Sequence, residues 1–487
     1  PESTEPAARA ASVPAPAAPV PAGELPLRFD RTASLGDLIA AHSGLAPQSD
    51  TGELHRVAGR VRTVRDMGRL AFADIADWTG ELQLFAQRAR LGEAFEEFRK
   101  LSVGDWVGAW GPLVTTKTGE LSIQLDGFEL LARSLRPWPD KRAGLTNLEA
   151  ARRRRYLDLA TSDESRKTLV ARSTMVAEMR RFFTGRGFIE VETPMLQPIP
   201  GGALAKPFVT HHTELGRDLY LRIAPELYLK RLLVGGVERV FEINRNFRNE
   251  GVSTQHNPEF TMLEAYQAFG DYTDMAELLE SLVKRVSQVV IGGLDAPGRG
   301  EAGRIDLGSP FRRARLVDLI RDIGVDPEGD LVVACDKLGV AHDPAWPWGK
   351  LLVEIYEKEI EHTLVQPTFV FDFPRDVSPL ARTHRSDPRF TEHLELIIGG
   401  MEIAPAYSEL NDPEEQLRRF RAQASQGGTM KPDEETHRVD MDYVEALEYG
   451  MPPAGGLGLG IDRLAMILTG ASSIRDVILF PASRPGD

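Results

Sequence analysis

Four side chains in the segment EFTMLEAYQ could together bind one extended ligand. The segment alternates apolar and polar residues, which predicts a β-strand with Phe260, Met262, Glu264 and Tyr266 on one face. At ~3.3 Å per residue, Phe260 and Glu264 lie roughly 13 Å apart, which suits a ligand with a flat group at one end and a cation at the other. The alternative is a sheet edge whose polar residues face water, and alternation alone favours neither interpretation.

The loop before this strand carries groups that suit a phosphorylated ligand. The segment RVFEINRNF also alternates, so the residues that separate it from EFTMLEAYQ are predicted to form the long loop of a hairpin. In this loop Arg248 offers a planar fork of donors for phosphate, Glu250 can accept from an exocyclic amine, and His256 follows. Alone, however, Arg-x-Glu is a common surface pair.

Two glutamates further along the chain could coordinate a divalent cation. Glu395 and Glu402 stand seven residues apart in FTEHLELIIGGMEIAPAYSELN, and one regular strand would direct them to opposite faces. Gly399 and Gly400 could supply a β-bulge that brings both carboxylates to one side, as Mg²⁺ bound together with phosphate oxygens would require. The alternative is that both glutamates are the solvated ends of an apolar strand.

A glycine-rich segment, GGLGLGIDRLAMIL, follows near the C-terminus. Its alternating glycines allow close approach of a ligand or a backbone, and the helix predicted after them places Arg463 near its positive N-terminal end. The spacing matches neither the dinucleotide-binding pattern nor the P-loop, so neither of those folds is indicated.

The elements that must position these residues indicate an α+β protein with a separate barrel. Five alternating runs over residues 54–133, the last being ELSIQLDGFELL, and one helical stretch over Leu91–Lys100 predict a small Greek-key barrel. After about residue 165, strands and helices follow in mixed order, which favours an antiparallel sheet flanked by helices. The predicted parts are a disordered Pro/Ala-rich tail (1–27), the barrel domain (28–145), and a second domain (146–487) with a helical insertion at about 308–370.

Composition narrows the class of protein. The 487 residues carry a net charge of −14, but residues 51–150 are neutral, so a localised nucleic-acid contact is most plausible in that segment. The single cysteine, Cys335, excludes an internal disulfide and a cysteine-rich metal site, which makes a reducing, cytoplasmic compartment the expectation. No apolar run is long enough to predict a membrane span.

Taken together, these segments resemble the class II lysyl-tRNA synthetases of the bacterial type over about residues 30–484. FFTGRGFIEVETPML resembles motif 1 of that family, FEINRNFRNEG with HNPEFTMLEAY resembles motif 2, and GLGLGIDRL resembles motif 3. RIAPELYLKR and TKTGELSI match as well. The resemblance implies an OB-fold barrel that reads the anticodon of tRNA(Lys), followed by a class II catalytic domain that forms a homodimer through motif 1.

The resemblance also implies a role for each candidate residue of an ATP site. Arg248 would hold the α-phosphate, Glu250 the adenine amino group and His256 the outer phosphates, with adenine between Phe260 and Arg463. Glu395 and Glu402 would hold Mg²⁺. The resemblance implies that the lysine carboxylate attacks the α-phosphorus of ATP to form a lysyl-adenylate. Arg248 and Arg463 would be the catalytic residues, because this step needs positioning and charge neutralisation rather than a dedicated protein base.

For L-lysine and for tRNA the resemblance implies two further sets of residues. Lysine would be bound by six residues: Gly202 and Glu226 at the α-amino group, and Glu264, Tyr266, Tyr407 and Glu409 at the ε-ammonium. The U-rich anticodon would be bound by Arg65, Phe72, Gln83 and Glu120, with Phe72 stacking on a base. From its pattern alone, Phe72 would be interpreted as barrel core.

One position departs from the family pattern. Where the family commonly has an asparagine that helps to hold the lysine carboxylate, this chain has Pro405. Proline has neither a backbone N–H nor an amide side chain, so that contact must be lost, replaced by water or taken over by Arg248.

Three alternative functions remain beside the attachment of lysine to tRNA. An aspartyl- or asparaginyl-tRNA synthetase would need cationic or amide groups in its pocket, whereas Glu226, Glu264 and Glu409 predict an acidic one. A protein lysyl-ligase would lack the anticodon barrel that residues 54–133 predict. A tRNA-binding paralogue with weakened or absent lysine activation is supported only by Pro405.

Overall fold

The computed structural model describes residues 25–139, 144–145, 147–202, 205–299, 303–426 and 439–482. The predicted tail over 1–27 lies outside the described residues except for its last three. The chain divides into two compact units, Pro1–Thr146 and Asn147–Asp487. Among the described residues, no helix is both long and apolar enough to cross a membrane.

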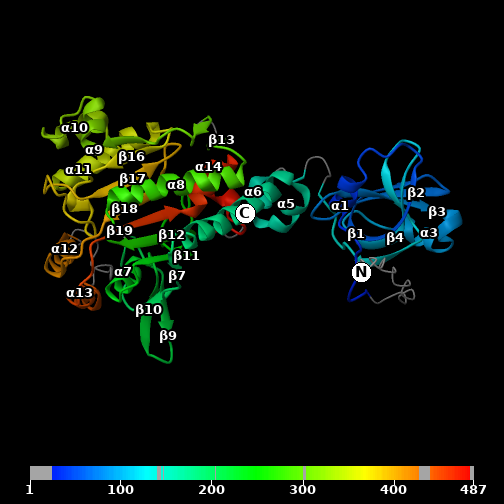
Figure 1. Ribbon diagram of the computed structural model, residues 1–487, viewed down its shortest axis with the longest axis horizontal. Coiled ribbons are helices and arrows are strands. Elements are labelled where there is room, and N and C mark those ends of the chain that lie inside the picture. The colour runs from blue at the N-terminus through cyan, green and yellow to red at the C-terminus, as the bar shows by residue number, and fades with distance from the viewer. Residues whose placement is uncertain are drawn as a thin grey trace, which may run out of the picture. The chain divides into compact units, whose positions relative to one another are not determined.

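The first unit is a closed β-barrel, which confirms the predicted barrel fold. Its six strands are β1 (Asp50–Asp66), β2 (Leu70–Ala76), β3 (Glu81–Gln87), β4 (Trp106–Thr115), β5 (Leu121–Gln124) and β6 (Gly127–Ala132). They run in the order β1-β2-β3-β5-β4-β6, and a pairing of β1 with β4 closes the barrel (Figure 1). Helix α1 (Leu35–Ala41) precedes the strands, and α2 (Arg88–Leu91) and α3 (Ala94–Arg99) connect β3 to β4.

Two details of the barrel differ from the sequence-based expectation. The run ELSIQLDGFELL, predicted as one strand, is divided into β5 and β6 at Asp126, whose N–H donates to the Trp110 carbonyl. At Gly127 a Cβ would lie 2.3 Å from the Trp110 ring, so the chain passes close to that ring only because this residue is glycine. The predicted helix over Leu91–Lys100 is likewise interrupted, because Gly92 ends α2 with φ +57°.

The second unit is built on an eight-stranded, mostly antiparallel sheet in the order β15-β16-β17-β18-β19-β12-β11-β7. Only the pairs β15–β16 and β11–β7 are parallel. The sheet strands are β7 (Ile189–Glu190), β11 (Arg239–Phe247), β12 (Glu259–Ala268), β15 (Arg312–Arg315), β16 (Thr368–Phe371), β17 (His393–Ile397), β18 (Glu402–Ser408) and β19 (Ala454–Gly460). This arrangement confirms the predicted α+β class with an antiparallel sheet.

Three helices cover one face of this sheet with a shared apolar core. They are α6 (Asp163–Thr184), α8 (Tyr272–Val290) and α14 (Ile461–Thr469), which lie beside one another over the sheet in Figure 1. Phe183, Leu279 and Leu464 of the three helices and Leu263 of the sheet are all buried in that core. Burying so much apolar area keeps the sheet rigid, so its opposite face can carry polar groups in fixed positions.

The remaining elements surround this core. Helices are α4 (Leu148–Arg153), α5 (Arg155–Thr161), α7 (Glu226–Val234), α9 (Leu316–Asp322), α10 (Leu331–Leu338), α11 (Trp348–Ile355), α12 (Pro413–Gln426), α13 (Met441–Glu448) and α15 (Ile474–Val477). Tyr356–Ile360 forms a π-helix, and 3₁₀ turns cover Glu361–Thr363 and Arg375–Val377. Two small sheets are formed by β8 (Leu196–Gln197), β9 (Val209–His212) and β10 (Arg217–Leu221), and by β13 (Asp295–Ala296) and β14 (Ile305–Asp306).

Candidate active site

Two adjoining cavities lie on the polar face of the large sheet. The larger has a volume of about 440 Å³ and the smaller about 120 Å³. Both are lined by Arg248, Met262, Glu402 and Pro405, so these four residues mark their junction. A single extended ligand could therefore occupy both cavities at once.

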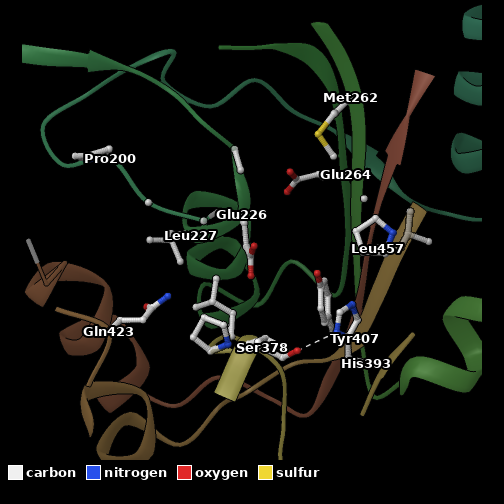
Figure 2. Close-up of a pocket in the computed structure, with 18 of the residues that line it drawn as sticks. Pro200, Glu226, Leu227, Met262, Glu264, Ser378, His393, Tyr407, Gln423 and Leu457 are labelled. Atoms are coloured by element: carbon white, nitrogen blue, oxygen red, sulfur yellow. Dashed lines mark hydrogen bonds between the residues drawn. The ribbon is translucent and has the colours of Figure 1, made fainter. Parts of the chain in front are cut away.

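Strand β12 connects the two cavities, as its alternation predicted. Phe260 and Met262 line the smaller cavity, and Met262, Glu264 and Tyr266 line the larger one. The alternative of a solvated sheet edge is wrong, because β12 pairs with β11 on one side and β19 on the other, and only 5% of Glu264 is exposed. Figure 2 shows the carboxylates of Glu264 and Glu226 entering the same space from β12 and α7.

The surroundings of the Glu264 carboxyl group favour its protonated form. Burial, reinforced by the nearby charge of Glu226, raises the pKa of Glu264 to about 8. The Tyr266 hydroxyl donates to Oε2 of Glu264 at 3.0 Å, which fixes the direction of the carboxyl group. Entry of a cation would favour the ionised form, so this carboxyl group can respond to the charge of its ligand.

Lys230, which the sequence analysis did not single out, neutralises part of this acidic pocket. Its ammonium lies 2.6 Å from Oε1 of Glu226 and forms a second ion pair with Glu409, and the side chain is fully buried. Burial alone would lower the pKa of Lys230, but the carboxylates of Glu226 and Glu409 outweigh it and raise the pKa. The only sequence signal was Glu-x-x-x-Lys on a helix, which usually indicates a surface pair.

Glu409 lies behind the cavity wall rather than in it. A Cβ at Gly456 of β19 would lie 2.0 Å from Oε1 of Glu409 and 2.5 Å from the Tyr266 ring, so only glycine leaves room for both side chains. Burial raises the pKa of Glu409 to about 7, although Lys230 opposes that shift. Glu409 therefore influences the pocket mainly through its ion pair with Lys230.

Gly202 lies at the mouth of the larger cavity, against α7. Its φ is +86°, and a Cβ there would approach the Cβ of Ala224 to 3.1 Å and that of Glu226 to 3.2 Å. A side chain at this position would be strained and would press on Glu226. The backbone of Gly202 and the carboxylate of Glu226 are thus brought together, as expected for groups that bind one amine.

The smaller cavity is aromatic and basic. Phe260 and Glu250 line it together with Arg248, whose guanidinium carbon lies 5.2 Å from the Phe260 ring centroid. Nη2 of Arg463 lies 3.2 Å from Nε2 of His256, and burial together with this guanidinium lowers the pKa of His256. A flat group and an anion would both be well accommodated here.

Arg463 is positioned by the residue before it. Asp462, near the start of α14, accepts from the Thr261 N–H of β12 at 2.8 Å and pairs with Arg172 of α6 at 2.7 Å. These contacts fix the first turn of α14 against β12. Nη1 of Arg463 then donates to the carbonyl of Glu402 at 2.8 Å and lies 3.2 Å from its carboxylate.

The structure has the predicted register shift between Glu395 and Glu402, but not at the two glycines: it lies beside Ile403, between the pairs Leu396–Ala404 and Ile397–Glu402 of β17 and β18. Gly399 and Gly400, with φ of +65° and +67°, form the turn of a hairpin, and the two glutamates lie on its adjacent strands β17 and β18. A Cβ at Gly400 would lie 2.6 Å from the His362 carbonyl, so the turn requires glycine. Both carboxylates still line the larger cavity, and burial with the charge of Glu402 raises the pKa of Glu395.

His393 and Tyr407 form the floor of the larger cavity, opposite each other on β17 and β18. Their rings stack with centroids 4.5 Å apart, and Nδ1 of His393 lies 2.9 Å from the Ser378 hydroxyl, the contact drawn in Figure 2. Burial lowers the pKa of His393 to about 3, so it is neutral. Sequence reasoning did not find His393 because a histidine on an apolar strand has no distinctive spacing.

The four predicted anticodon residues gather on one surface of the barrel. Arg65 on β1 lies opposite Phe72 on β2, Gln83 is on β3, and Glu120 is in the turn before β5. Phe72 is half-buried on the face opposite the core and stacks on Phe85 at 5.0 Å, so the interpretation of Phe72 as barrel core is wrong. Gln83 is largely buried and accepts from the Ser122 hydroxyl.

Comparisons with known proteins agree with this geometry. Residues 147–484 match the family model "tRNA synthetases class II (D, K and N)", and residues 55–131 match "OB-fold nucleic acid binding domain". The chain is 51% identical to a lysine–tRNA ligase of Xanthomonas oryzae pv. oryzae over 89% of this chain and 87% of that protein. It is 48% identical to a lysine–tRNA ligase of Carboxydothermus hydrogenoformans over 94% of both. This chain therefore belongs to the lysine–tRNA ligases of the class II tRNA synthetase family.

Proposed function

We propose that this chain joins L-lysine to tRNA(Lys) through a lysyl-adenylate, with the two cavities holding lysine and ATP side by side. The observation that carries the proposal is the junction at Arg248 between a cavity lined by carboxylates and one lined by aromatic and basic groups. Lysine offers a cation for the first cavity, and ATP offers a flat base and phosphates for the second. Their reacting groups, the lysine carboxylate and the α-phosphate, would then meet at Arg248.

In the larger cavity, lysine would be held at both ends. The Gly202 backbone and the Glu226 carboxylate would bind its α-amino group, and Glu264 with Tyr266 would bind the ε-ammonium. Tyr407 would form the wall between them, and Glu409 would act through Lys230. Three acidic residues and one buried ammonium leave this pocket selective for a cationic side chain.

In the smaller cavity, the adenine of ATP would lie on Phe260, with Arg463 on its other side and Glu250 accepting from its amino group. His256 would face the outer phosphates. In the present structure Arg248 covers Phe260 and Arg463 is paired with Glu402, so ATP would displace both guanidinium groups from their present partners. The two arginines would then neutralise charge on the phosphate oxygens.

Glu395 and Glu402 fit a Mg²⁺ ion. Both ligands are hard carboxylate oxygens, and burial together with the charge of Glu402 raises the pKa of Glu395 even though the Arg463 guanidinium opposes that shift. Mg²⁺ bound there would supply charge neutralisation for the departing pyrophosphate. Glu361, which accepts from the Glu402 N–H at 3.1 Å, would keep Glu402 in place.

The protein's contribution to the chemistry would be positioning and electrostatics. The lysine carboxylate would attack the α-phosphorus in line as pyrophosphate leaves, and a ribose hydroxyl at the 3′ end of tRNA would then attack the lysyl-adenylate. Arg248 and Arg463 would stabilise the charge that develops on the phosphate oxygens. We assign no side chain as a dedicated base for this step.

We also propose that the protein forms a homodimer through the motif 1 segment.

Restoring an amide at position 405 should tighten lysine binding. Pro405 of β18 lies opposite Glu395 of β17 and lines both cavities. An asparagine at this position could donate a hydrogen bond to the lysine carboxylate. We expect Pro405→Asn to lower the KM for lysine about 5- to 10-fold, the value of one hydrogen bond, with little change in kcat. Pro405→Ala removes the proline without adding a donor, and an equal gain in that control would contradict the explanation.

Removing the Phe72 ring should weaken tRNA binding without affecting lysine activation. We expect Phe72→Ala to raise the KM for tRNA(Lys) about 10- to 100-fold, because base stacking on an aromatic ring contributes ~1–3 kcal/mol. Lysine-dependent ATP/pyrophosphate exchange, which needs no tRNA, should be unchanged. Phe72→Tyr keeps a stacking ring and should restore most of the affinity, whereas a loss equal to that of Phe72→Ala would show that stacking is not the cause.

Aminoacylation with defined tRNAs tests the proposed function. Transcripts of tRNA(Lys), tRNA(Asp) and tRNA(Asn) would be incubated with ATP, Mg²⁺ and each of the three amino acids. We expect lysyl-tRNA(Lys) as the only substantial product. Aspartylation or asparaginylation, or the absence of any charged tRNA, would contradict the proposal.

A further inference from the structure

Two histidines and a glutamate form a compact group in the barrel unit, outside the surface that carries the proposed anticodon residues. His42 is the C-cap residue of α1. Glu53 and His55 are two residues apart near the start of β1, so their side chains point to the same side of that strand. Among the described residues, this is the one group of three or more His, Cys, Asp or Glu side chains whose ligand atoms converge closely enough for a metal ion. The three ligand atoms lie within 4.8 Å of one another.

Two of the three separations among these atoms have the length found between neighbouring ligand atoms of zinc. Nε2 of His42 lies 3.3 Å and Nε2 of His55 lies 3.1 Å from the same oxygen of Glu53, Oε2. Metal–ligand bonds of about 2.0–2.1 Å in a tetrahedron place neighbouring ligand atoms roughly 3.3 Å apart. Both edges that meet at the carboxylate oxygen therefore have about the tetrahedral length, and the third edge, between the two imidazole nitrogens, is no longer than 4.8 Å.

Burial leaves room for a fourth ligand on the solvent side. The imidazole side chains are only 16% and 15% exposed, whereas the Glu53 side chain is 54% exposed. Nδ1 of His55 is buried and has no hydrogen-bond partner among the described residues, so this imidazole interacts through Nε2 alone. Without a cation, both contacts to Glu53 are hydrogen bonds only if each imidazole carries a proton on Nε2.

From this arrangement we infer that His42, Glu53 and His55 form a binding site for a divalent transition-metal ion such as Zn²⁺, completed by water. Two imidazoles and one carboxylate suit Zn²⁺ and its neighbours in the first transition row, whereas Mg²⁺ prefers oxygen ligands alone. The site is independent of the lysine and ATP cavities, which lie in the other unit of the chain.

The bound metal would connect both ends of the segment that runs from α1 to β1. Within that segment, the N–H of Gln48 donates to the Thr116 carbonyl at 3.2 Å, and the N–H of Ser49 donates to the Thr115 hydroxyl at 2.9 Å. Thr116 in turn begins the turn that carries Glu120, with a backbone hydrogen bond of 2.9 Å between them. Closing this loop with a metal should therefore stabilise the barrel around that turn.

Zinc binding to the full-length chain tests the inference. After treatment with a chelator, the protein would be titrated with Zn²⁺ in millimolar Mg²⁺, which keeps the hard site of Glu395 and Glu402 filled, and bound zinc would be measured after dialysis. We expect one Zn²⁺ per chain and a rise in the unfolding temperature on adding Zn²⁺. Absence of saturable zinc binding by the unmodified chain overturns the inference, whatever the variants do.

Variants then locate the bound ion. His42→Gln and His55→Gln should each weaken zinc binding about 100-fold or more and abolish the rise in unfolding temperature. His211→Gln is the matched control, because His211 also pairs with a carboxylate, that of Asp218 at 2.7 Å, but has no second histidine in a converging group. Zinc binding that persists in the His42 and His55 variants would place the ion elsewhere and overturn the inference.

Discussion

Replacing Lys230 by methionine is expected to lower the free energy of unfolding by about 3–5 kcal/mol and to raise the KM for lysine at least about tenfold. The fully buried ammonium is shared by Glu226 and Glu409, so its removal leaves two buried carboxylates without a counter-ion. These carboxylates would then take up protons or move apart. Either response disturbs Glu226, the proposed partner of the lysine α-amino group, while the KM for ATP should stay nearly constant.

A second lysine on another helix provides the control for this prediction. Lys284 pairs with Glu280 at 2.7 Å with the same i,i+4 spacing, but its side chain is 26% exposed. Because such pairs contribute little at a surface, Lys284→Met should cost less than about 1 kcal/mol and leave both KM values unchanged. Chemical denaturation and exchange kinetics measure the two effects, and a Lys230→Met protein as stable as the parent would contradict the assigned role.

Replacing Glu264 by glutamine is expected to raise the KM for lysine about 10- to 100-fold, the value of a hydrogen bond to a charged group. Glutamine keeps the shape of the side chain and can still accept from the Tyr266 hydroxyl, so the loss isolates the negative charge. Glu259→Gln is the matched control, because Glu259 lies on the same strand with its side chain 54% exposed. A change of similar size in that control would show that the effect is not specific to the pocket.

The same substitution should remove a pH dependence. Burial raises the pKa of Glu264 to about 8, and a cationic ligand binds the ionised carboxylate more tightly than the neutral acid. The KM for lysine should therefore fall as pH rises from 6 to about 8 and then level off, because above that pH the carboxylate is already ionised. In Glu264→Gln the KM should vary little over this range, and a persistent pH dependence would assign the titration to another group.

The hairpin of β11 and β12 could be predicted from sequence because both strands alternate and the loop between them is polar. The location of Phe260 and Glu264 on one face, where they line adjoining cavities, followed from the same period. What alternation could not reveal was whether β12 lies at an edge of the sheet, since that depends on its pairing with β19, a strand almost 190 residues further along the chain. The resemblance to a known family, rather than spacing, was needed to decide between an edge strand and a strand that lines a binding site.

Other features could not be predicted because different structures share one local pattern. Two glycines between two glutamates fit a bulge as well as a hairpin turn, and only the pairing of β17 with β18 shows that the glycines form the turn while the register shifts beside Ile403. Lys230 and Lys284 have the same spacing to a glutamate, yet one is fully buried under a pocket and the other is partly exposed. Pattern alone places Phe72 in the core, because a half-exposed aromatic residue has the same apolar side chain as a core residue.

Amino-acid-dependent ATP/pyrophosphate exchange across all twenty amino acids, with Mg²⁺ and without tRNA, tests most directly the claim that this pocket selects and activates lysine. The arrangement of Glu226, Glu264 and Lys230 beside the smaller cavity predicts exchange with lysine and none above background with aspartate or asparagine. Exchange with lysine would also show that Pro405 is compatible with adenylate formation. Exchange with another amino acid in preference to lysine, or with none at all, would contradict the proposed site.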